Sequence, residues 1–140
     1  MEKHRAIAER AFALMNAHEL GKLVELIADD CDVVFAGAPT MRGPREFAGF
    51  VRAWLDAFPD IKHEIVSYVE DGDAASWEVR VTGTHTGTMV TRNGPLPATG
   101  RRITIEAVDV ARFRDGKAVS WHIYHDQLAV LQQLGLAPAA

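Results

Sequence analysis

The sequence predicts an α+β fold: a cone-shaped barrel in which a curved antiparallel sheet wraps around three N-terminal helices, with a short helix at the C-terminus. Two observations lead to this prediction. Apolar residues recur at helical spacing up to residue 58 and again after residue 126, whereas polar and apolar residues alternate along much of the chain between. Helices followed by a run of strands are typical of α+β proteins, whose helices cover one face of a sheet. The 140 residues, 48% of them hydrophobic, are expected to form one domain spanning residues 1–140.

Four helical segments are expected. They are residues 3–17, 20–28, 43–58 and 127–134. Pro44 suits the first turn of the third helix, where its missing N–H has no helical partner, and Pro59 follows the end of that helix. Asp126 is well placed to cap the last helix, and Gly135 is well placed to end it.

Five strands are expected. They are residues 33–35, 63–69, 75–86, 102–113 and 118–125. Alternation along the second of them predicts that Ile65, Ser67 and Val69 share one face. Residues 87–100 are rich in glycine and proline and are expected to be a loop. A sheet that curls around helices encloses an apolar interior, where small-molecule sites are often found.

Charge and composition exclude several classes of protein. A net charge of −4 and a pI near 5.8 offer no basic surface for nucleic acid. The sequence has no run of ~20 apolar residues and no signal-type apolar segment at its start, so no membrane contact is expected and the protein is predicted to be cytoplasmic. The single cysteine, Cys31, lies between Asp30 and Asp32, which disfavour its thiolate, and is interpreted as structural.

Asp109 stands in the middle of an apolar strand. Strand alternation places it on the same face as Ile105, Ala107 and Ala111, which suit a cavity wall. A lone carboxyl in an apolar wall is unusual and points to chemistry or recognition. No metal site is expected, because the three-residue spacing of His122 and His125 puts them on opposite faces of a strand.

The hairpin after Asp109 leaves two registers open. A three-residue loop at residues 114–116 places Asp109 beside Trp121, with Ile123 and His125 on the same face. A two-residue turn, Asp115-Gly116, instead places Asp109 opposite His122.

Four short motifs lie in the second half of the chain. They are Gly83-Thr84-His85-Thr86-Gly87, Pro97-x-Thr99-Gly100-Arg101, residues 109–116 and Asp126-Gln127. Together they resemble the SnoaL-like polyketide cyclases, which belong to the nuclear-transport-factor-like superfamily that also contains ketosteroid isomerase. The resemblance covers nearly the whole chain, since the order of helices and strands fits as well. It favours the three-residue hairpin loop and hence inward-facing side chains at Trp121, Ile123 and His125.

The resemblance also implies a reaction without metal or cofactor and a role for Asp109. Asp109 falls on the strand position of the acid that stabilises an oxyanion in ketosteroid isomerase. The candidate catalytic residues are Asp109, with His85 or His125 assisting it. The candidate substrate-binding residues are Phe35, Trp54, Phe58, Trp121 and Ile123, of which the aromatic ones are expected in the core first and in the pocket wall second. The catalytic base of the isomerase falls at Phe35, and the catalytic aspartate of the cyclases falls at about Ile123, so two acids of the superfamily are replaced by apolar residues.

The leading hypothesis is a cofactor-independent cyclase or isomerase that performs acid–base chemistry, by aldol reaction or enolisation, on a hydrophobic carbonyl compound. The alternative is a non-catalytic small-molecule-binding domain of the same fold. A third hypothesis, epoxide hydrolysis, ranks lower because Asp109 lacks the Asp and Arg partners that would position water.

The outer face of the sheet is expected to be covered. Val108, Val110 and Tyr124 fall on this face, opposite to Asp109. We therefore predict that two copies of the chain form a homodimer through this convex surface. The expected partners are thus a second copy of the protein and a hydrophobic small molecule.

Overall fold

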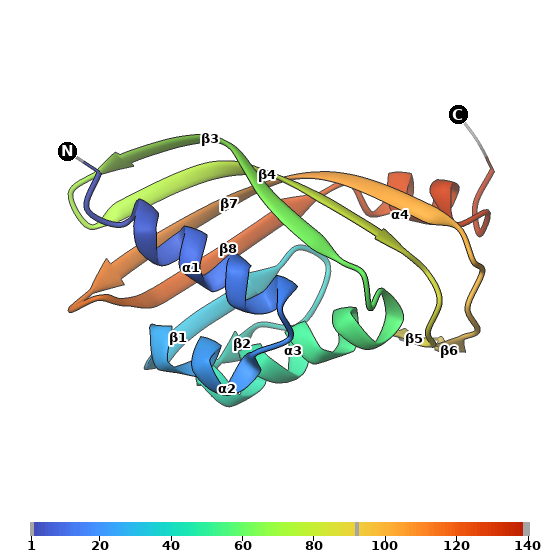
Figure 1. The fold of residues 1–140 in the computed structure, drawn as a ribbon, viewed down its shortest axis with the longest axis horizontal. Coiled ribbons are helices and arrows are strands. Elements are labelled where there is room, and N and C mark those ends of the chain that lie inside the picture. The colour runs from blue at the N-terminus through green and yellow to red at the C-terminus, as the bar shows by residue number, and fades with distance from the viewer. Residues whose placement is uncertain (1, 92, 139–140) are drawn as a thin grey trace.

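The computed structural model describes residues 2–91 and 93–138, and within them four α-helices accompany one curved sheet of six strands (Figure 1). The helices are α1 (Arg5–Asn16), α2 (Leu20–Leu23), α3 (Gly43–Ala57) and α4 (Gln127–Gln133), with a 3-10 turn at Val24–Leu26. The strands of the main sheet are β1 (Ile27–Phe35), β2 (Met41–Arg42), β3 (Lys62–Asp71), β4 (Ala74–Thr84), β7 (Arg102–Arg114) and β8 (Lys117–His125). A separate small hairpin is formed by β5 (Met89–Thr91) and β6 (Gly94–Leu96). No helix among the described residues is long and apolar enough to cross a membrane.

The main sheet is mixed and open, with strand order β2-β1-β8-β7-β4-β3. The strands joined by hairpins, β3 with β4 and β7 with β8, are antiparallel, as expected, but β1 runs parallel to β8. The prediction of a purely antiparallel barrel is therefore corrected, while the α+β class is confirmed. The sequence could not show that β1 runs parallel to β8, because most of the chain, rather than a turn, connects these two strands.

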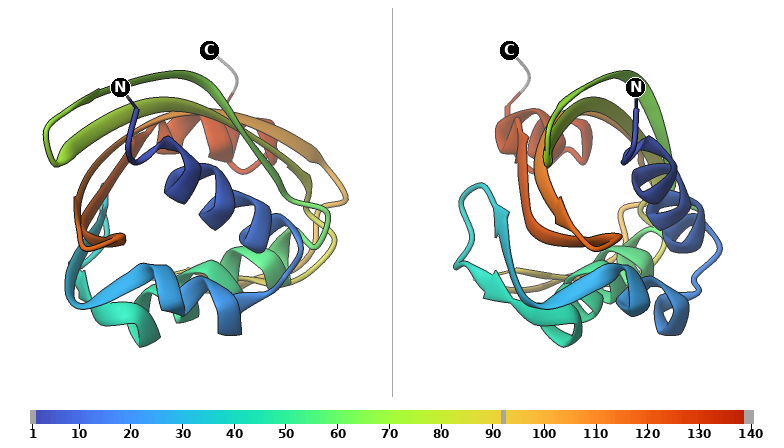
Figure 2. Two further views of the ribbon diagram at one scale, coloured as in Figure 1. Left: turned by 60° about the vertical axis from the view of Figure 1, so that its left-hand side comes forward. Right: turned by 90° about the vertical axis from the view of Figure 1, so that its left-hand side faces the viewer.

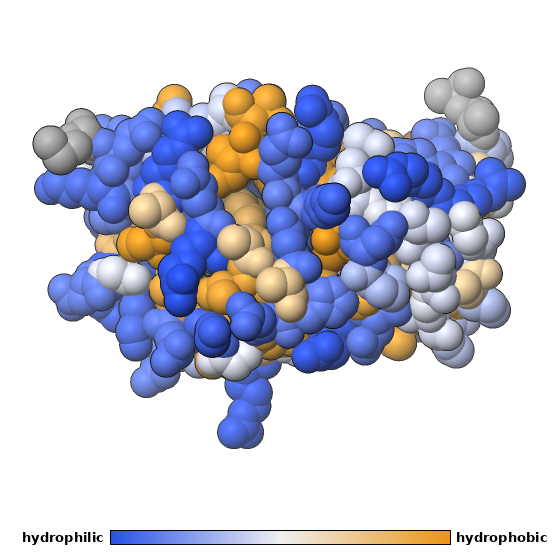
Figure 3. All heavy atoms as spheres, in the orientation of Figure 1, coloured by the Kyte–Doolittle hydropathy of each residue, from blue (hydrophilic) through white to orange (hydrophobic). Residues whose placement is uncertain are grey.

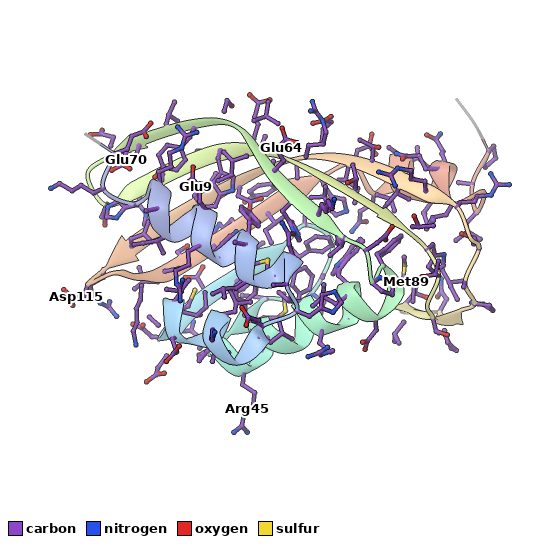
Figure 4. The ribbon with its side chains drawn as sticks, viewed as in Figure 1. Glu9, Arg45, Glu64, Glu70, Met89 and Asp115 are labelled. Carbon is purple, nitrogen blue, oxygen red and sulfur yellow. The ribbon has the colours of Figure 1, made fainter. Side chains whose placement is uncertain are left out.

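The sheet curls around α1, and α3 lies across its open side (Figure 2). Helix α1 packs on β3, and α3 packs on β1. Strand β7 shows why the concave side is apolar: its buried and exposed residues alternate without a break along all 13 positions. Labelled charged side chains such as Glu9 and Arg45 project outward, while many other side chains occupy the space between the helices and the sheet (Figure 4).

The predicted second helix is shorter than expected. It ends at Leu23, and the chain enters β1 at Ile27, where Ile27, Cys31 and Val33 are buried. The helical spacing of apolar residues through residues 20–28 thus gave the wrong element for its last part, because pairing with β8 determines the conformation there. Burial raises the pKa of the Cys31 thiol to about 12, consistent with the structural interpretation of this residue.

Strand β3 contains an irregularity that reverses its faces. Ile65 pairs with Val79, but Ser67 pairs with Glu78, so one residue is inserted. Ile65 and Tyr68 pack against the core, whereas Ser67 is exposed. The prediction that Ile65, Ser67 and Val69 share a face was therefore wrong.

The other element predictions hold with small changes. The Asp126 side chain accepts a hydrogen bond from the Ala129 N–H (3.0 Å), so it caps α4 as expected. Gly135 follows α4 with a φ of 74°, in the left-handed region. The expected loop at 87–100 contains the β5–β6 hairpin.

The hairpin between β7 and β8 combines features of both registers considered above. Asp115 and Gly116 have φ values of 53° and 78°, and Arg114 pairs with Lys117, which defines a two-residue turn. A bulge in β8 at residue 119 then shifts the register by one residue, so that Asp109 pairs with Ile123 rather than with His122 or Trp121. The favoured loop was wrong, but the favoured face was right.

The outer face of the sheet carries apolar side chains, as the strand pattern predicts. Val108 and Val110 are each 43% exposed and Tyr124 is 47% exposed. Figure 3 shows a different face, the one on which α1 lies, and there apolar side chains form patches within a largely hydrophilic surface. The homodimer stays a prediction.

Candidate active site

A cavity of about 80 Å³ lies between α1, α3 and the concave face of the sheet. One water needs roughly 10–15 Å³ of such space, so the cavity can hold more than a single solvent molecule. Its wall is apolar except for three titratable side chains: Asp109, His63 and His125. Such a site suits an apolar ligand with few polar groups.

Asp109 is 2% exposed and has an asymmetric environment. Its Oδ2 atom accepts hydrogen bonds from Nε1 of Trp121 (2.9 Å) and from Nε1 of Trp77 (3.2 Å). Its Oδ1 atom is buried and has no hydrogen-bond partner among the described residues. A polar atom left in this state favours a ligand that can bond to it.

Burial raises the pKa of Asp109 to about 7, while the hydrogen bonds from Trp121 and Trp77 act in the opposite direction. Desolvation prevails because no cation among the described residues pairs with this carboxyl. Asp109 therefore has both its acid and its base form available near neutral pH, which is the condition for efficient proton transfer in both directions.

His125 lies on the same wall as Asp109. It pairs with Ala107, two residues along β7 from Asp109. Its ring packs on Phe35 at 4.4 Å, and its Nδ1 is buried without a partner among the described residues. Burial lowers the pKa of His125, so the ring is neutral near pH 7.

His63 is a cavity residue that sequence reasoning missed. Its Nδ1 lies 2.8 Å from Oδ1 of Asn16, and its backbone N–H donates to the same oxygen (2.9 Å). Burial lowers the pKa of His63 to about 4, so the ring is neutral and its Nδ1 carries the proton that Asn16 accepts. Parity along β3 offered a signal, since His63 shares a face with Ile65, but nothing in the sequence showed the contact with α1.

We expect Asn16→Ala to lower the free energy of unfolding by about 2 kcal/mol, because Asn16 makes three hydrogen bonds to His63 in a half-buried position. Urea denaturation of both proteins measures this. A loss below about 0.5 kcal/mol would show that this clamp does not stabilise the fold.

His85 and Phe58, which were candidates for an assisting and a substrate-binding residue, are not part of the cavity wall. His85 is fully buried against Phe58 (5.2 Å), and its Nδ1 accepts a hydrogen bond from the Thr99 N–H (3.2 Å). Its backbone also bonds to Arg101 and Gly100. His85 thus joins the end of β4 to residues 99–101, and no contact links it to Asp109.

The other candidate substrate-binding residues line the cavity. Phe35, Trp54, Trp121 and Ile123 all belong to its wall, with Ile123 directly beside Asp109. The ring of Phe58 stacks on that of Trp54 (5.5 Å) but is not part of the cavity wall.

His122 faces away from the cavity. Its Nε2 lies 2.6 Å from Oδ2 of Asp32 on the outer side of the sheet. This hydrogen bond lowers the pKa of Asp32. In the part of the chain that the structure describes, no cluster of three or more His, Cys, Asp or Glu residues could hold a metal ion.

Comparison with known proteins identifies the family. The family model for SnoaL-like polyketide cyclases matches residues 5–134. The chain belongs to this family. It is 36% identical over 99 residues to an aklanonic acid methyl ester cyclase, DnrD of Streptomyces peucetius; the match covers 69% of this chain and 65% of that protein, slightly less than two thirds.

Several solved structures share the fold over nearly the whole chain. IdmH of Streptomyces antibioticus, described as a putative polyketide cyclase, superposes with a TM-score of 0.80 at 26% identity and covers 96% of this chain and 99% of its own. AclR of Streptomyces galilaeus, described as a putative hydroxylase, has a TM-score of 0.83 at 23% identity and covers 99% of this chain and 88% of its own. Family membership and the names of the cyclase relatives support a cyclase function, whereas the fold by itself accommodates several activities.

Proposed function

We propose that this protein is a cofactor-independent cyclase that closes a ring in an apolar, carbonyl-bearing small molecule, with Asp109 as the acid–base residue. The observation that carries the proposal is the free Oδ1 of an acid buried in an apolar cavity. Since the relative named above is an aklanonic acid methyl ester cyclase, the methyl ester of aklanonic acid is the substrate to test first.

The proposed reaction moves one proton and forms one carbon–carbon bond. Asp109, as a carboxylate, removes a proton from the carbon next to a carbonyl and leaves an enolate. The enolate carbon attacks a second carbonyl carbon of the same molecule, which forms the ring and leaves an alkoxide. Protonated Asp109 then returns its proton to the alkoxide, so the product is an isomer of the substrate and the enzyme is unchanged.

His125 is proposed to assist by hydrogen bonding to a substrate oxygen. It is neutral, it shares the wall with Asp109, and its Nδ1 has no protein partner among the described residues. Donors that are already in position where charge develops stabilise an enolate or alkoxide without reorganisation.

The test is turnover of aklanonic acid methyl ester, followed by chromatography and mass spectrometry for a product of unchanged mass. We expect Asp109→Asn to lose nearly all turnover and His125→Asn to lose part of it. His122→Asn is the matched control, since this histidine lies on the outer side of the same strand and is expected to leave the rate unchanged. Full turnover by Asp109→Asn would contradict the proposal.

A binding domain without catalysis is the second candidate. It is favoured by Phe35 and Ile123, which occupy the wall beside His125 and Asp109 where related enzymes are expected to carry acids. Saturable binding of the ester by the wild-type protein with no product after long incubation would favour this candidate over the enzyme.

A further inference from the structure

Two tryptophans contact a single oxygen of Asp109. Trp77 on β4 pairs directly with Asp109, and Trp121 on β8 lies one inward-facing position further along, opposite Ala111. Their two Nε1–H groups both donate to Oδ2, over 3.2 and 2.9 Å, and neither donates to Oδ1.

Packing fixes the two indoles in this arrangement. Each is 1% exposed. Their rings meet edge to face at 5.5 Å, and the ring of Phe12 contacts both edge-on, at 6.2 Å from Trp77 and 5.7 Å from Trp121. Because neither N–H can turn to solvent, both donate to Asp109 whatever the state of the cavity.

The two hydrogen bonds use both lone pairs of Oδ2. A proton on that oxygen would have to displace an indole N–H and leave it buried without an acceptor, which is unfavourable. Oδ1 has no such competitor among the described residues, so a proton on Asp109 resides on Oδ1.

We infer that Trp77 and Trp121 are positioning residues that give the two oxygens of Asp109 separate tasks: Oδ2 holds negative charge, and Oδ1 takes and returns every proton. This inference rests on the proposed acid–base function for its catalytic meaning, but the assignment of the two oxygens can be tested without a substrate.

The groups around Asp109 simplify its titration. His63 on β3 and His125 on β8 are the titratable side chains, apart from Asp109 itself, that line the cavity among the described residues; α1 and α3 contribute apolar side chains there. Burial lowers the pKa of both histidines, that of His63 to about 4, whereas burial raises the pKa of Asp109 to about 7, so their titrations are shifted away from that of Asp109.

The first experiment follows the indole N–H resonances of the whole protein by NMR as a function of pH. The chain has three tryptophans, and Trp54 provides an internal control because it lines the same cavity and makes no hydrogen bond to Asp109. We expect the Trp77 and Trp121 signals to shift with one common midpoint near pH 7 and the Trp54 signal to stay constant. In Asp109→Asn both shifts should disappear.

If only one indole, or neither, follows this titration, or if the shifts persist in Asp109→Asn, the inference is wrong. This measurement uses the wild-type protein, so it does not depend on the folding of a tryptophan variant.

The second experiment removes one donor at a time. Trp77→Phe and Trp121→Phe are each expected to raise the pKa of Asp109 by about one unit, measured from the carboxyl carbon resonance, because a hydrogen bond to the charged form is lost. Such a rise would lower the ionised fraction at pH 7 roughly fivefold. Trp54→Phe should leave this pKa unchanged, and an unchanged pKa in both other variants would overturn the inference.

The two proposals can fail independently. Paired indole titration together with full turnover by Asp109→Asn would preserve the positioning of Asp109 and refute its catalytic role. Loss of turnover in Asp109→Asn without titration of the indole signals would support the catalytic role of Asp109 and refute its positioning by Trp77 and Trp121.

Discussion

Asp109→Asn is expected to make the protein more stable at pH 8 and to lower its turnover rate at least about 100-fold. The stability gain follows from proton linkage. Burial raises the pKa of Asp109 from 3.8 to about 7, so between these values the folded protein binds a proton that the unfolded chain does not. The contribution of Asp109 to the free energy of unfolding is therefore most favourable below about pH 4, falls as the pH rises toward 7, and stays reduced above it.

Asparagine mimics the protonated acid at every pH. Its amide oxygen can accept from the indoles of Trp77 and Trp121, and its NH₂ group occupies the place of Oδ1–H. One pKa unit corresponds to about 1.36 kcal/mol, so the variant is expected to gain about 2–4 kcal/mol at pH 8. The loss of turnover follows because an amide cannot exchange a proton in this range, and acid–base catalysis contributes about 10²–10⁴-fold.

Urea denaturation at pH 5 and pH 8, combined with the turnover assay, measures both effects. The gain should be smaller at pH 5 than at pH 8. Asp32→Asn is a control of opposite sign, because His122 lowers the pKa of Asp32 and the ionised form therefore stabilises the fold at neutral pH. A pH-independent difference between Asp109→Asn and the wild type would contradict the raised pKa.

The opposed effects would identify Asp109 as a residue retained for function. A group that destabilises the fold at working pH persists where activity requires it. A purely structural acid would show the reverse: its removal would lower stability at every pH at which it is ionised.

Local pattern was sufficient to find Asp109 and the face on which it lies. Alternation along β7 is complete, and a period of two residues determines which side chains face inward without knowledge of the partner strands. Alternation left two hairpin registers open for Trp121, Ile123 and His125, and the family resemblance favoured the correct face although the loop that it favoured was wrong.

The bulges and the non-local contacts could not be read from the sequence. The extra residue in β8 has no distinctive residue type, yet it decides whether His122 or Ile123 lies beside Asp109. The bonds from Trp77 to Asp109 and from Asn16 to His63 span 32 and 47 residues, so they depend on how strands and helices assemble rather than on any local signal.

Gly87→Ala is expected to lower the free energy of unfolding by about 3 kcal/mol or more. Gly87 follows β4 and passes so close to the end of α3 that a Cβ atom there would lie 1.8 Å from the Asp56 carbonyl oxygen. The obstacle is backbone, so the two segments must separate. Separation also weakens the hydrogen bond from the Gly87 N–H to the Ala57 carbonyl, now 3.1 Å.

Gly49→Ala is the matched control for this substitution. Gly49 lies within α3, and a Cβ there has no neighbour within 4 Å, so we expect a gain of about 0.5–1 kcal/mol from the higher helix propensity of alanine. Urea denaturation of both variants gives the comparison, and a Gly87→Ala loss below about 1 kcal/mol would show that the contact relaxes easily.

The contact at Gly87 bears on the cavity as well as on stability. It holds the last turn of α3, and that part of the helix supplies Trp54 and Leu55 to the cavity wall. A Gly87→Ala protein that still folds at low temperature should therefore bind the apolar ligand more weakly, although Gly87 itself is not part of the wall. The glycine that ends the Gly83–Gly87 motif would then be explained by close packing of two backbones rather than by contact with the substrate.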